Sequence, residues 1–326
     1  MSQNVRHVVI PLFPGVELLD VAGPAEVFTV ANYEAGDEAY RIHYLCLRPR
    51  RSVRAYSGLE IRGKSWRAMP KAVNTLVVPG AEFRPLYEAL ADGQLLRAID
   101  RLAERSERCT SVCSGAFFLG ELGRLDGHRV TTHWVGVGEL AMRYPEATVV
   151  EDSLYQRDGN LWTSAGVLSG VDMTLAMVRE DLGAEIALKV ARRLVVFLIR
   201  DGGQPQFSAP MNLQSRAAGR ELGELVSWLE TRLSEPVTVA DMAERVAMSV
   251  RTLHRRCLET FGMTPARLLG ELRLEHARSR LHSAHVPVKH IAYECGFSSQ
   301  PALSKAFTQR FGVAPSRYRE NFREHP

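Results

Sequence analysis

Two kinds of hydrophobic pattern divide the chain near residue 200. Between residues 5 and 200, short β-branched and apolar runs alternate with stretches in which apolar residues recur every three or four positions. The first pattern is typical of buried strands and the second of amphipathic helices, so their alternation predicts βαβ units with a mainly parallel sheet covered on both faces. The predicted strands are VRHVVIPLF (5–13), YRIHYLCL (40–47), NTLVVPG (74–80), CTSVC (109–113) and HRVTTHW (128–134), and helices are expected to begin near Asp20, Arg84, Ser114, Gly136 and Ser169.

The pattern changes after a segment rich in Gly and Pro. Residues 201–219 show no apolar period and are predicted to form a linker. Beyond it the strand signals vanish, and residues 221–322 have the spacing of short amphipathic helices. The expected fold is therefore an α/β flavodoxin-like sandwich over residues 1–200 and an all-α domain over residues 220–326.

The helical third contains an internal repeat. Residues 239–267 resemble residues 288–317, first at an offset of 49 positions and then, after one inserted residue, at an offset of 50. The matched pairs include Met242 with Ile291, Ala243 with Ala292, Leu253 with Leu303, Cys257 with Phe307 and Phe261 with Phe311. Two copies of a short two-helix unit predict a double helix-turn-helix domain. The alternative is a plain helical bundle whose Arg side chains are merely solvated.

Capping residues support this assignment. Thr238 and Asp241 have the spacing of a capping box, Ser249 suits the start of the next helix, and Gly262 suits a left-handed helix end. The stretch that begins at Pro265 is expected to form one longer helix between the two units. Such a connector would hold the two recognition helices about one DNA turn, roughly 34 Å, apart.

The second helix of each unit has an apolar stripe and a polar face. The apolar stripe leaves polar and basic positions outward, namely Arg251, His254 and Arg255 in the first unit and Gln300, Pro301, Ser304 and Lys305 in the second. Arg can donate two hydrogen bonds to guanine in the major groove, and Gln can pair with adenine. These seven residues are therefore the candidate DNA-binding residues.

Over nearly all of residues 221–322, and most specifically in ECGFSSQPALSKAFTQRFGVAPSRYR, the chain resembles the AraC/XylS family of DNA-binding domains. The resemblance places that family's base-facing positions on the same seven residues. Pro301 departs from the polar residue often found there, which implies weaker base reading by the second unit. In this family the second unit often contacts RNA polymerase or the DNA backbone more than the bases.

The net charge of +4 is small but unevenly distributed. Residues 216–326 hold 17 Lys and Arg against 12 Asp and Glu, whereas residues 1–215 hold 24 against 25. A basic third joined to a near-neutral body indicates a nucleic-acid-binding module attached to a second domain. From charge alone, a solvated basic surface is the alternative.

The five Cys residues are odd in number and lack CxxC spacing, so neither a disulfide framework nor a metal site is predicted, and no cofactor is expected. No apolar run reaches the roughly 18 residues that span a bilayer, and the N-terminus lacks the features of a secretory signal. A cytoplasmic location without a membrane partner is therefore expected.

Cys113 lies where a strand-like run gives way to the helix-like run SGAFFLG. A nucleophile on such a turn projects above the sheet, and the helix N-terminus that follows is expected to lower the pKa of the thiol and favour thiolate. A buried Cys without chemistry is the alternative, since Cys is among the most often buried residues. Asp20 could equally be a helix N-cap, and His133 a core or loop residue.

Together with LVVPGAE and TSAGVLSGVDMTLAMVREDLG, the Cys113 stretch resembles the ThiJ/PfpI superfamily, which is related to class I glutamine amidotransferases, over about residues 5–200. Enzymes of that superfamily, isonitrile hydratase-like ones included, use such a Cys and an acid for thiol chemistry. The resemblance places the acid at Asp20, five positions after Gly15, and a His at His133. The effector-binding residues that it implies are Glu17, Asp20, Gly80, Cys113, Ser114 and His133.

Two departures count against glutamine amidotransfer. That reaction needs a His-x-Glu pair late in the domain, yet no His occurs between His133 and His254, and Ala81 replaces a common second Gly. No general base for the thiol is evident.

The two halves together resemble the GlxA-like branch of transcriptional regulators, which implies promoter binding and a response to small metabolites such as amino acids or quaternary amines. Three acidic residues, Glu17, Asp20 and Glu82, suggest a cationic effector. We expect a transcriptional activator, not an enzyme, whose partners are promoter DNA, a small-molecule effector, RNA polymerase and a second copy in a homodimer. The alternatives are a thiol-dependent enzyme of hydratase, amidase or glyoxalase type, and a cysteine redox sensor, each carrying a DNA-binding domain.

Overall fold

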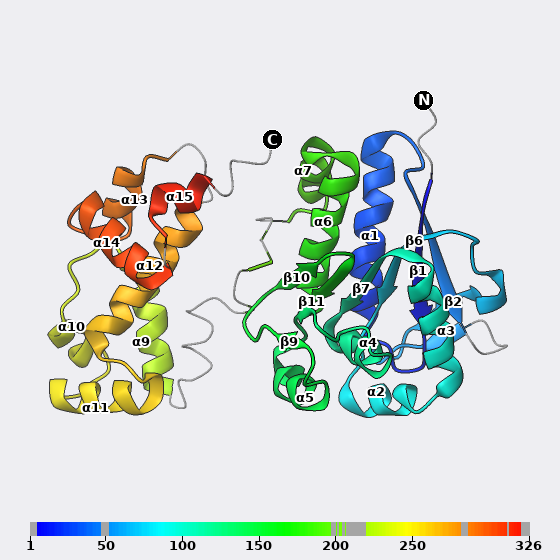
Figure 1. Ribbon diagram of the computed structural model, residues 1–326. Coiled ribbons are helices and arrows are strands. Elements are labelled where there is room, and N and C mark those ends of the chain that lie inside the picture. The colour runs from blue at the N-terminus through cyan, green and yellow to red at the C-terminus, as the bar shows by residue number, and fades with distance from the viewer. Residues whose placement is uncertain are drawn as a thin grey trace. The chain divides into compact units, whose positions relative to one another are not determined.

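The computed structural model divides the chain into two compact units, Met1–Gln206 and Phe207–Pro326, the first built around a sheet and the second helical (Figure 1). It describes residues 5–46, 52–196, 200, 202–203, 206, 220–281, 286–311 and 313–320. The expected linker 201–219 therefore lies outside the described residues except at positions 202, 203 and 206.

The first unit alternates strands and helices along the chain. Its elements are β1 (Arg6–Leu12), α1 (Leu18–Ala35), β2 (Tyr40–Cys46), β3 (Ser52–Arg54), β4 (Glu60–Arg62), β5 (Lys64–Ser65), β6 (Val73–Val78), α2 (Phe83–Leu90), α3 (Gly93–Glu104), β7 (Ser106–Val112), α4 (Ala116–Glu121), β8 (Arg129–Val130), α5 (Val137–Arg143), β9 (Thr148–Val149), β10 (Tyr155–Asp158), β11 (Leu161–Ser164), α6 (Leu168–Leu182) and α7 (Ala184–Arg193). Short 3-10 helices cover Trp66–Ala68, Cys113–Gly115 and Trp134–Gly136.

The main sheet has the strand order β10-β11-β7-β6-β1-β2-β5. Neighbouring strands from β5 to β11 pair in parallel, and only β10 is antiparallel to its neighbour. The five central strands have the order of a flavodoxin-like sheet, which confirms the expected fold class. Helices α1, α6 and α7 pack together on one face, and α2, α3 and α4 cover the other (Figure 1).

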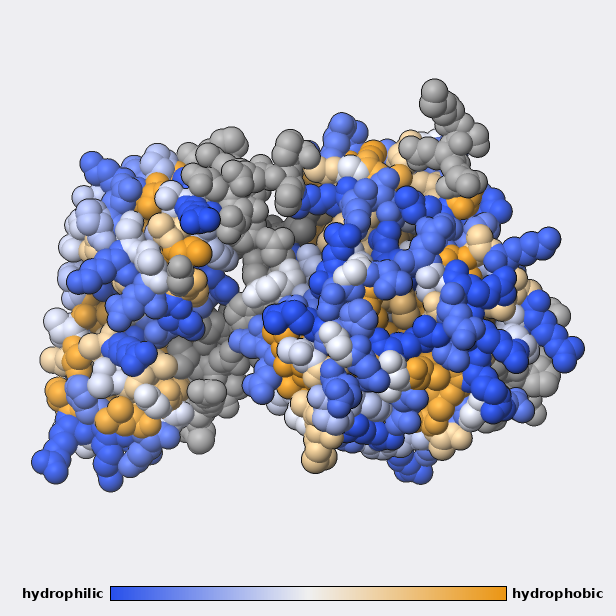
Figure 2. Space-filling view, in the orientation of Figure 1, coloured by the Kyte–Doolittle hydropathy of each residue, from blue (hydrophilic) through white to orange (hydrophobic). Residues whose placement is uncertain are grey.

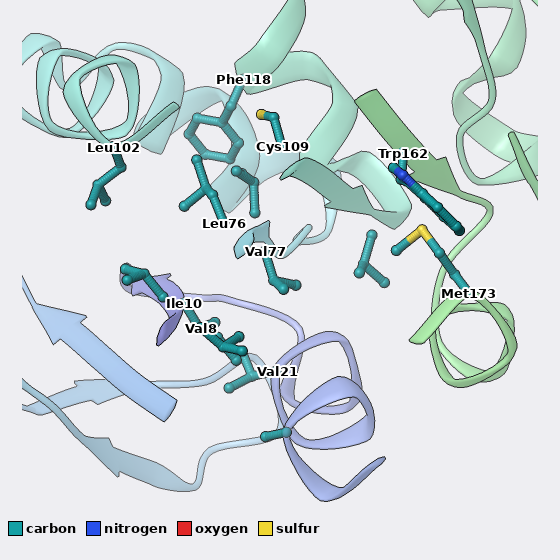
Figure 3. Close-up of a cluster of buried hydrophobic side chains, with 14 of the residues drawn as sticks. Val8, Ile10, Val21, Leu76, Val77, Leu102, Cys109, Phe118, Trp162 and Met173 are labelled. Atoms are coloured by element: carbon teal, nitrogen blue, oxygen red, sulfur yellow. The ribbon is translucent and has the colours of Figure 1, made fainter. Parts of the chain in front are cut away.

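The central strands are apolar on both faces because helices cover both sides. Figure 3 shows Leu76, Leu102 and Phe118 packed on one side of the sheet, and Val8 with Val21 of α1 on the other. All five side chains are almost completely buried. This two-sided core fixes the strands whose ends carry the candidate site.

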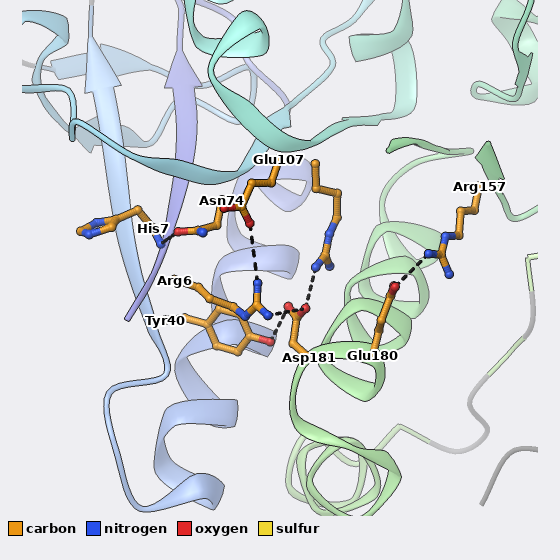
Figure 4. A network of polar contacts seen from close by, with 9 residues as sticks. Arg6, His7, Tyr40, Asn74, Glu107, Arg157, Glu180 and Asp181 are labelled. Carbon is orange, nitrogen blue, oxygen red and sulfur yellow. Dashed lines mark hydrogen bonds and ion pairs between the residues drawn. The ribbon is translucent and has the colours of Figure 1, made fainter. Parts of the chain in front are cut away.

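A buried ion-pair network fastens the amino-terminal ends of the strands. Asp181 near the end of α6 accepts hydrogen bonds from the Tyr40 hydroxyl at 2.9 Å and from Arg108 Nη2 at 2.6 Å, and Arg6 Nη2 lies 3.6 Å away (Figure 4). Burial and the Asp181 charge raise the pKa of the Tyr40 phenol, which keeps it a donor. The network closes the end of the sheet opposite the loops that follow the strands.

β10 and β11 form a hairpin around Asp158 and Gly159, a dipeptide typical of tight hairpin turns, and Gly159 has φ +62°. The strand predicted over residues 128–134 is mostly wrong, since only Arg129–Val130 pairs, with β9 and outside the main sheet. The backbone N–H of Thr131 donates instead to the Thr163 hydroxyl, and the Thr131 hydroxyl donates to Val150 O. The polar groups of this buried segment are therefore satisfied by hydrogen bonds that involve side chains rather than by pairing in the main sheet.

The second unit contains seven helices among the described residues. They are α9 (Arg220–Glu230), α10 (Val239–Arg245), α11 (Val250–Phe261), α12 (Pro265–Leu281), α13 (Val288–Glu294), α14 (Gln300–Phe311) and α15 (Pro315–Glu320). The pairs α10–α11 and α13–α14 are the two expected helix-turn-helix units. Each has its own hydrophobic cluster, and α12 supplies residues to both, among them Leu272 to the first and Leu274 to the second.

The predicted caps are present. Thr238 and Asp241 form the capping box, the Ser249 hydroxyl accepts from Thr252 N at 3.1 Å, and Gly262 ends α11 with φ +69°.

Hydrophilic residues dominate the visible surface of each unit, with scattered hydrophobic patches (Figure 2). Within the described part of the chain, no helix is long and apolar enough to cross a bilayer.

Candidate functional site

The candidate effector site lies at the carboxyl ends of the parallel strands. The chain leaves β1 and β6 in opposite directions along the sheet, and in open α/β sheets ligands bind in the crevice at such a switch point. The two loops at this point are tied together by a bridge between Val16 and Ala81, and Glu17 N donates to Gly80 O at 2.8 Å. The loops therefore form one rigid rim.

Asp20 connects three loops of this rim. Its side chain is fully buried, Oδ2 accepts from Gly80 N at 3.1 Å, and Oδ1 accepts from Val167 N at 2.9 Å. Burial raises the pKa of Asp20 to about 7, although both backbone donors and a side-chain hydrogen bond with Cys113 oppose the rise. Asp20 is the third residue of α1, and Glu17 occupies the N-cap, so the N-cap alternative for Asp20 is wrong.

Cys113 occupies the sharp turn between β7 and α4. Its φ of +57° is unusual for a residue with a side chain and indicates backbone strain at the turn. The glycines beside it allow close packing: a Cβ added at Gly166 would lie 2.5 Å from Cys113 Cβ, and one at Gly115 would overlap Val78 O. Thr132 completes the support, because its hydroxyl donates to Cys113 O at 2.8 Å.

The expected thiolate is not supported. Burial, and then the nearby charge of Asp20, raise the pKa of the Cys113 thiol well above its ordinary value, and Glu17 and Glu82 add to the effect. A hydrogen bond from the Ser114 backbone lowers it less. The prediction that the helix N-terminus lowers the pKa of this thiol is contradicted, because burial and the neighbouring carboxylates act in the opposite direction.

Ser114 and Gly80 are also fully engaged. The Ser114 hydroxyl donates to Ala81 O at 2.6 Å and accepts from Ala81 N at 2.8 Å, which clamps the β6 loop to the Cys113 turn. Gly80 uses its N–H on Asp20 and its carbonyl on Glu17, and an added Cβ would lie 2.6 Å from Ser114 Oγ. These residues shape the site through the backbone.

Glu17, Cys113 and His133 are half-buried, whereas Glu82 is exposed. Burial lowers the pKa of His133, and the charge of Glu82 opposes this effect. The His133 and Trp134 rings have centroids 5.8 Å apart. The accessible part of the site thus carries two acidic side chains, a thiol and an imidazole.

Sequence reasoning missed the loop that closes the site. Val167 has φ +49° and donates its backbone N–H to Asp20, while Gly166 packs on Cys113. The glycine in TSAGVLSG was the one available signal, and nothing in the sequence shows that this loop meets α1. Among the described residues, no group of three or more His, Cys, Asp or Glu could hold a metal ion.

The candidate DNA-binding residues lie on the outer sides of α11 and α14. Arg251, Arg255, Gln300, Pro301 and Lys305 are exposed, and His254 and Ser304 are partly so. The opposite sides are buried, since Leu253, Cys257, Leu303 and Phe307 belong to the two cores. Each recognition helix therefore presents the polar face that the sequence predicted.

The fold and the two helix-turn-helix units define a two-part regulator, an α/β sandwich joined to a DNA-binding module. Residues 6–180 match the DJ-1/PfpI family and residues 242–321 match a helix-turn-helix domain. The chain belongs to the DJ-1/PfpI family, as the sequence resemblance predicted.

Relatives named as transcriptional regulators match most of the chain. The chain is 30% identical over 258 residues to the HTH-type transcriptional regulator ArgR of Pseudomonas aeruginosa, covering 79% of this chain and 77% of that protein. It is 28% identical over 326 residues to the HTH-type transcriptional regulator GlxA of Rhizobium meliloti, covering 98% and 97%. The crystal structure of a THiJ/PfpI family protein from Pseudomonas syringae superimposes with a TM-score of 0.55 at 25% identity, over 75% of this chain and 90% of that one. The protein is a DNA-binding transcriptional regulator.

Proposed function

We propose that this regulator binds a small, positively charged metabolite at the Cys113 turn, and that binding changes its activity at a promoter. The observation that carries the proposal is a group of three acidic residues around the Cys113 turn: Glu17 and Glu82 directly follow the bridged residues Val16 and Ala81, and the buried Asp20 shares a hydrogen bond with Cys113. None of them takes part in an ion pair among the described residues. An amine or quaternary ammonium group would supply the missing positive charge.

The site residues divide into two roles. Glu17, Cys113 and His133 are accessible enough to contact the effector, whereas Asp20, Gly80 and Ser114 hold the surrounding loops. A ligand that prefers one arrangement of these loops shifts the equilibrium by its difference in affinity for the two arrangements. We infer that this shift is transmitted to the DNA-binding unit as activation of transcription.

We infer that the site is not catalytic. A thiol enzyme needs a base to activate the nucleophile, and His133 makes no hydrogen bond to Cys113 in the described structure. Oxidation to sulfenic acid likewise proceeds through thiolate, which the raised pKa of Cys113 disfavours. Both observations argue against the enzyme and redox-sensor alternatives.

For the DNA-binding unit, we infer that Arg251, His254 and Arg255 read bases and that α14 contacts the backbone or RNA polymerase through Gln300, Pro301, Ser304 and Lys305. A homodimer would place two such units on one promoter, and we assign the protein to the cytoplasm. The exposure of these side chains and their position on the two recognition helices support this reading.

Thermal unfolding of the full chain with a panel of amino acids and quaternary amines tests the effector proposal. A ligand present at 100 times its Kd stabilises the protein by about 2.7 kcal/mol, so a binding amine is expected to raise the Tm while its uncharged isostere does not. The variants Glu17→Gln and Glu82→Gln should weaken this response. Glu88→Gln is the matched control, because Glu88 lies on α2 and pairs with Arg84 instead.

Equal shifts from charged and uncharged isosteres, or an unchanged response in both Gln variants, would contradict a cationic effector. Cys113→Ser separates binding from thiol chemistry. We expect it to keep the amine-dependent Tm rise, and turnover of a ligand that is lost in this variant would establish the enzyme alternative.

A further inference from the structure

The turn between α13 and α14 touches the first helix-turn-helix unit. Gly296 lies in this turn with φ +73°, and a Cβ added to it would overlap the carbonyl oxygen of Leu233 and lie 2.6 Å from Arg273 Nε. Leu233 follows α9 and belongs to the hydrophobic core of the first helix-turn-helix unit. The second helix-turn-helix unit therefore contacts the backbone of the first at this turn.

Arg273 of α12 holds the same point from the other side. Its Nε donates to Leu233 O at 2.9 Å and its Nη2 donates to Glu235 O at 2.6 Å. The side chain is half-buried, and burial lowers the pKa of the guanidinium without removing its charge. One side chain thus ties the connecting helix to the loop that precedes α10.

The connecting helix α12 also makes polar contacts with the second helix-turn-helix unit. Arg280 donates two hydrogen bonds to Glu294 of α13, at 3.1 and 2.7 Å, and Glu271 accepts from Arg310 of α14 at 2.7 Å. The two hydrophobic cores themselves are separate clusters. Without the Gly296 contact, α12 with its polar contacts would be the main link between them.

The equivalent turn of the first helix-turn-helix unit shows why position 296 is glycine. Ala247 lies 49 residues earlier, in the turn between α10 and α11, and adopts φ +51° with its side chain exposed. The left-handed conformation of this turn is therefore compatible with alanine. Glycine is required at 296 because of the Leu233 carbonyl and the Arg273 guanidinium, not because of the turn.

We propose that Gly296 and Arg273 are positioning residues that fix the separation of the recognition helices α11 and α14, and so determine the spacing of the two DNA subsites that this regulator accepts. A helix-turn-helix protein that presents two recognition helices rigidly binds only subsites whose spacing matches. Loss of the contact would leave each unit folded while the separation of the two helices varies more.

The test uses the full-length protein and an operator isolated from random DNA by repeated selection. Footprinting locates the two subsites, and Kd is then measured on operators with 0, 1, 2 and 5 base pairs inserted between them. For the wild type we expect a steep loss of affinity with insertion. Gly296→Ala and Arg273→Ala should each weaken binding at the native spacing by about fivefold to thirtyfold and lose proportionally less on insertion.

Ala247→Gly is the matched control, since it exchanges the same two residue types in the equivalent turn and should keep the wild-type spacing profile. Circular dichroism establishes that each variant is folded. In the double variant of Gly296 and Arg273, the two losses of affinity should be less than additive, because both substitutions disrupt the same contact.

The spacing profile distinguishes this role from a general structural one. A loss that is equal at every spacing would show that the substitutions only damage the fold or the DNA surface. If Arg273→Ala keeps the wild-type profile, the proposal is overturned whatever Gly296→Ala does.

Discussion

The Cys113 site and the outer face of α11 use their polar side chains in opposite ways. Around Cys113, the Asp20 carboxylate and the Ser114 hydroxyl are both spent on backbone groups inside the protein. On α11, Arg251 and Arg255 extend from the surface, and the Arg255 side chain is 69% exposed. Substitutions of Asp20 or Ser114 should therefore act through the fold, and those of Arg251 or Arg255 through lost contacts with DNA.

The largest effect should come from Gly166→Ala. The added methyl group would lie 2.5 Å from Cys113 Cβ, and φ +108° is unfavourable for alanine. Combined overpacking and strain should lower the free energy of unfolding of the first unit by about 4 kcal/mol, measured by urea unfolding.

Gly159→Ala provides the control for the strain alone. Gly159 also has a positive φ, +62°, but a Cβ there would meet nothing within 4 Å. We expect about 1 kcal/mol of destabilisation. Equal losses at the two positions would show that the site is not packed as tightly as the contacts at Cys113 indicate.

Asp20 should give the first unit a distinctive dependence on pH. Because burial raises its pKa in the folded protein to about 7, the unfolded chain releases this proton near pH 4 while the folded chain keeps it to about pH 7. The free energy of unfolding should therefore fall between pH 4 and 7, by up to about 1.4 kcal/mol per pH unit from this group.

Urea unfolding across this range, with Asp20→Asn for comparison, measures the effect. The amide does not titrate, so the variant should lack this part of the slope, even though it is less stable by about 1 to 3 kcal/mol from imperfect hydrogen bonding to Gly80 and Val167. Identical slopes in both proteins would contradict a buried, proton-holding Asp20.

On the DNA-binding side, Arg255→Ala should weaken binding to the selected operator by about 1 to 3 kcal/mol and relax base preference at one position. Arg256→Ala is the adjacent control, because Arg256 donates to Glu221 within the domain. It should leave base preference unchanged in a competition assay with operator variants. Retained preference in the Arg255 variant would remove this residue from base reading.

The sequence predicted the helical domain in greater detail than the α/β domain. Helix caps such as Thr238, Ser249 and Gly262 are local signals, and each copy of the internal repeat supported the assignment of the other. The parallel sheet was also predictable, because β1 and β6 are short, largely apolar runs between helical stretches. The outward-facing polar positions of α11 and α14 followed directly from helical periodicity.

The chemistry of the Cys113 turn was less predictable because it depends on contacts between distant segments. Asp20 meets Gly80 and Val167, at sequence separations of 60 and 147 residues. Burial of Cys113 and the nearness of Asp20, which together raise the pKa of the thiol, both depend on this long-range packing. The contact of Gly296 with Leu233 could not be predicted for the same reason, because Gly296 and Phe297 have the sequence of an ordinary turn.

The long sequence separations at Asp20 also have a consequence for the synthesis of the protein. The candidate site cannot be complete until residue 167 has left the ribosome and β11 has joined the sheet, because that segment supplies one of the two backbone donors to Asp20. Nonlocal contacts of this kind form late in folding. A newly made chain therefore acquires the arrangement around Cys113 only when its whole α/β unit has folded.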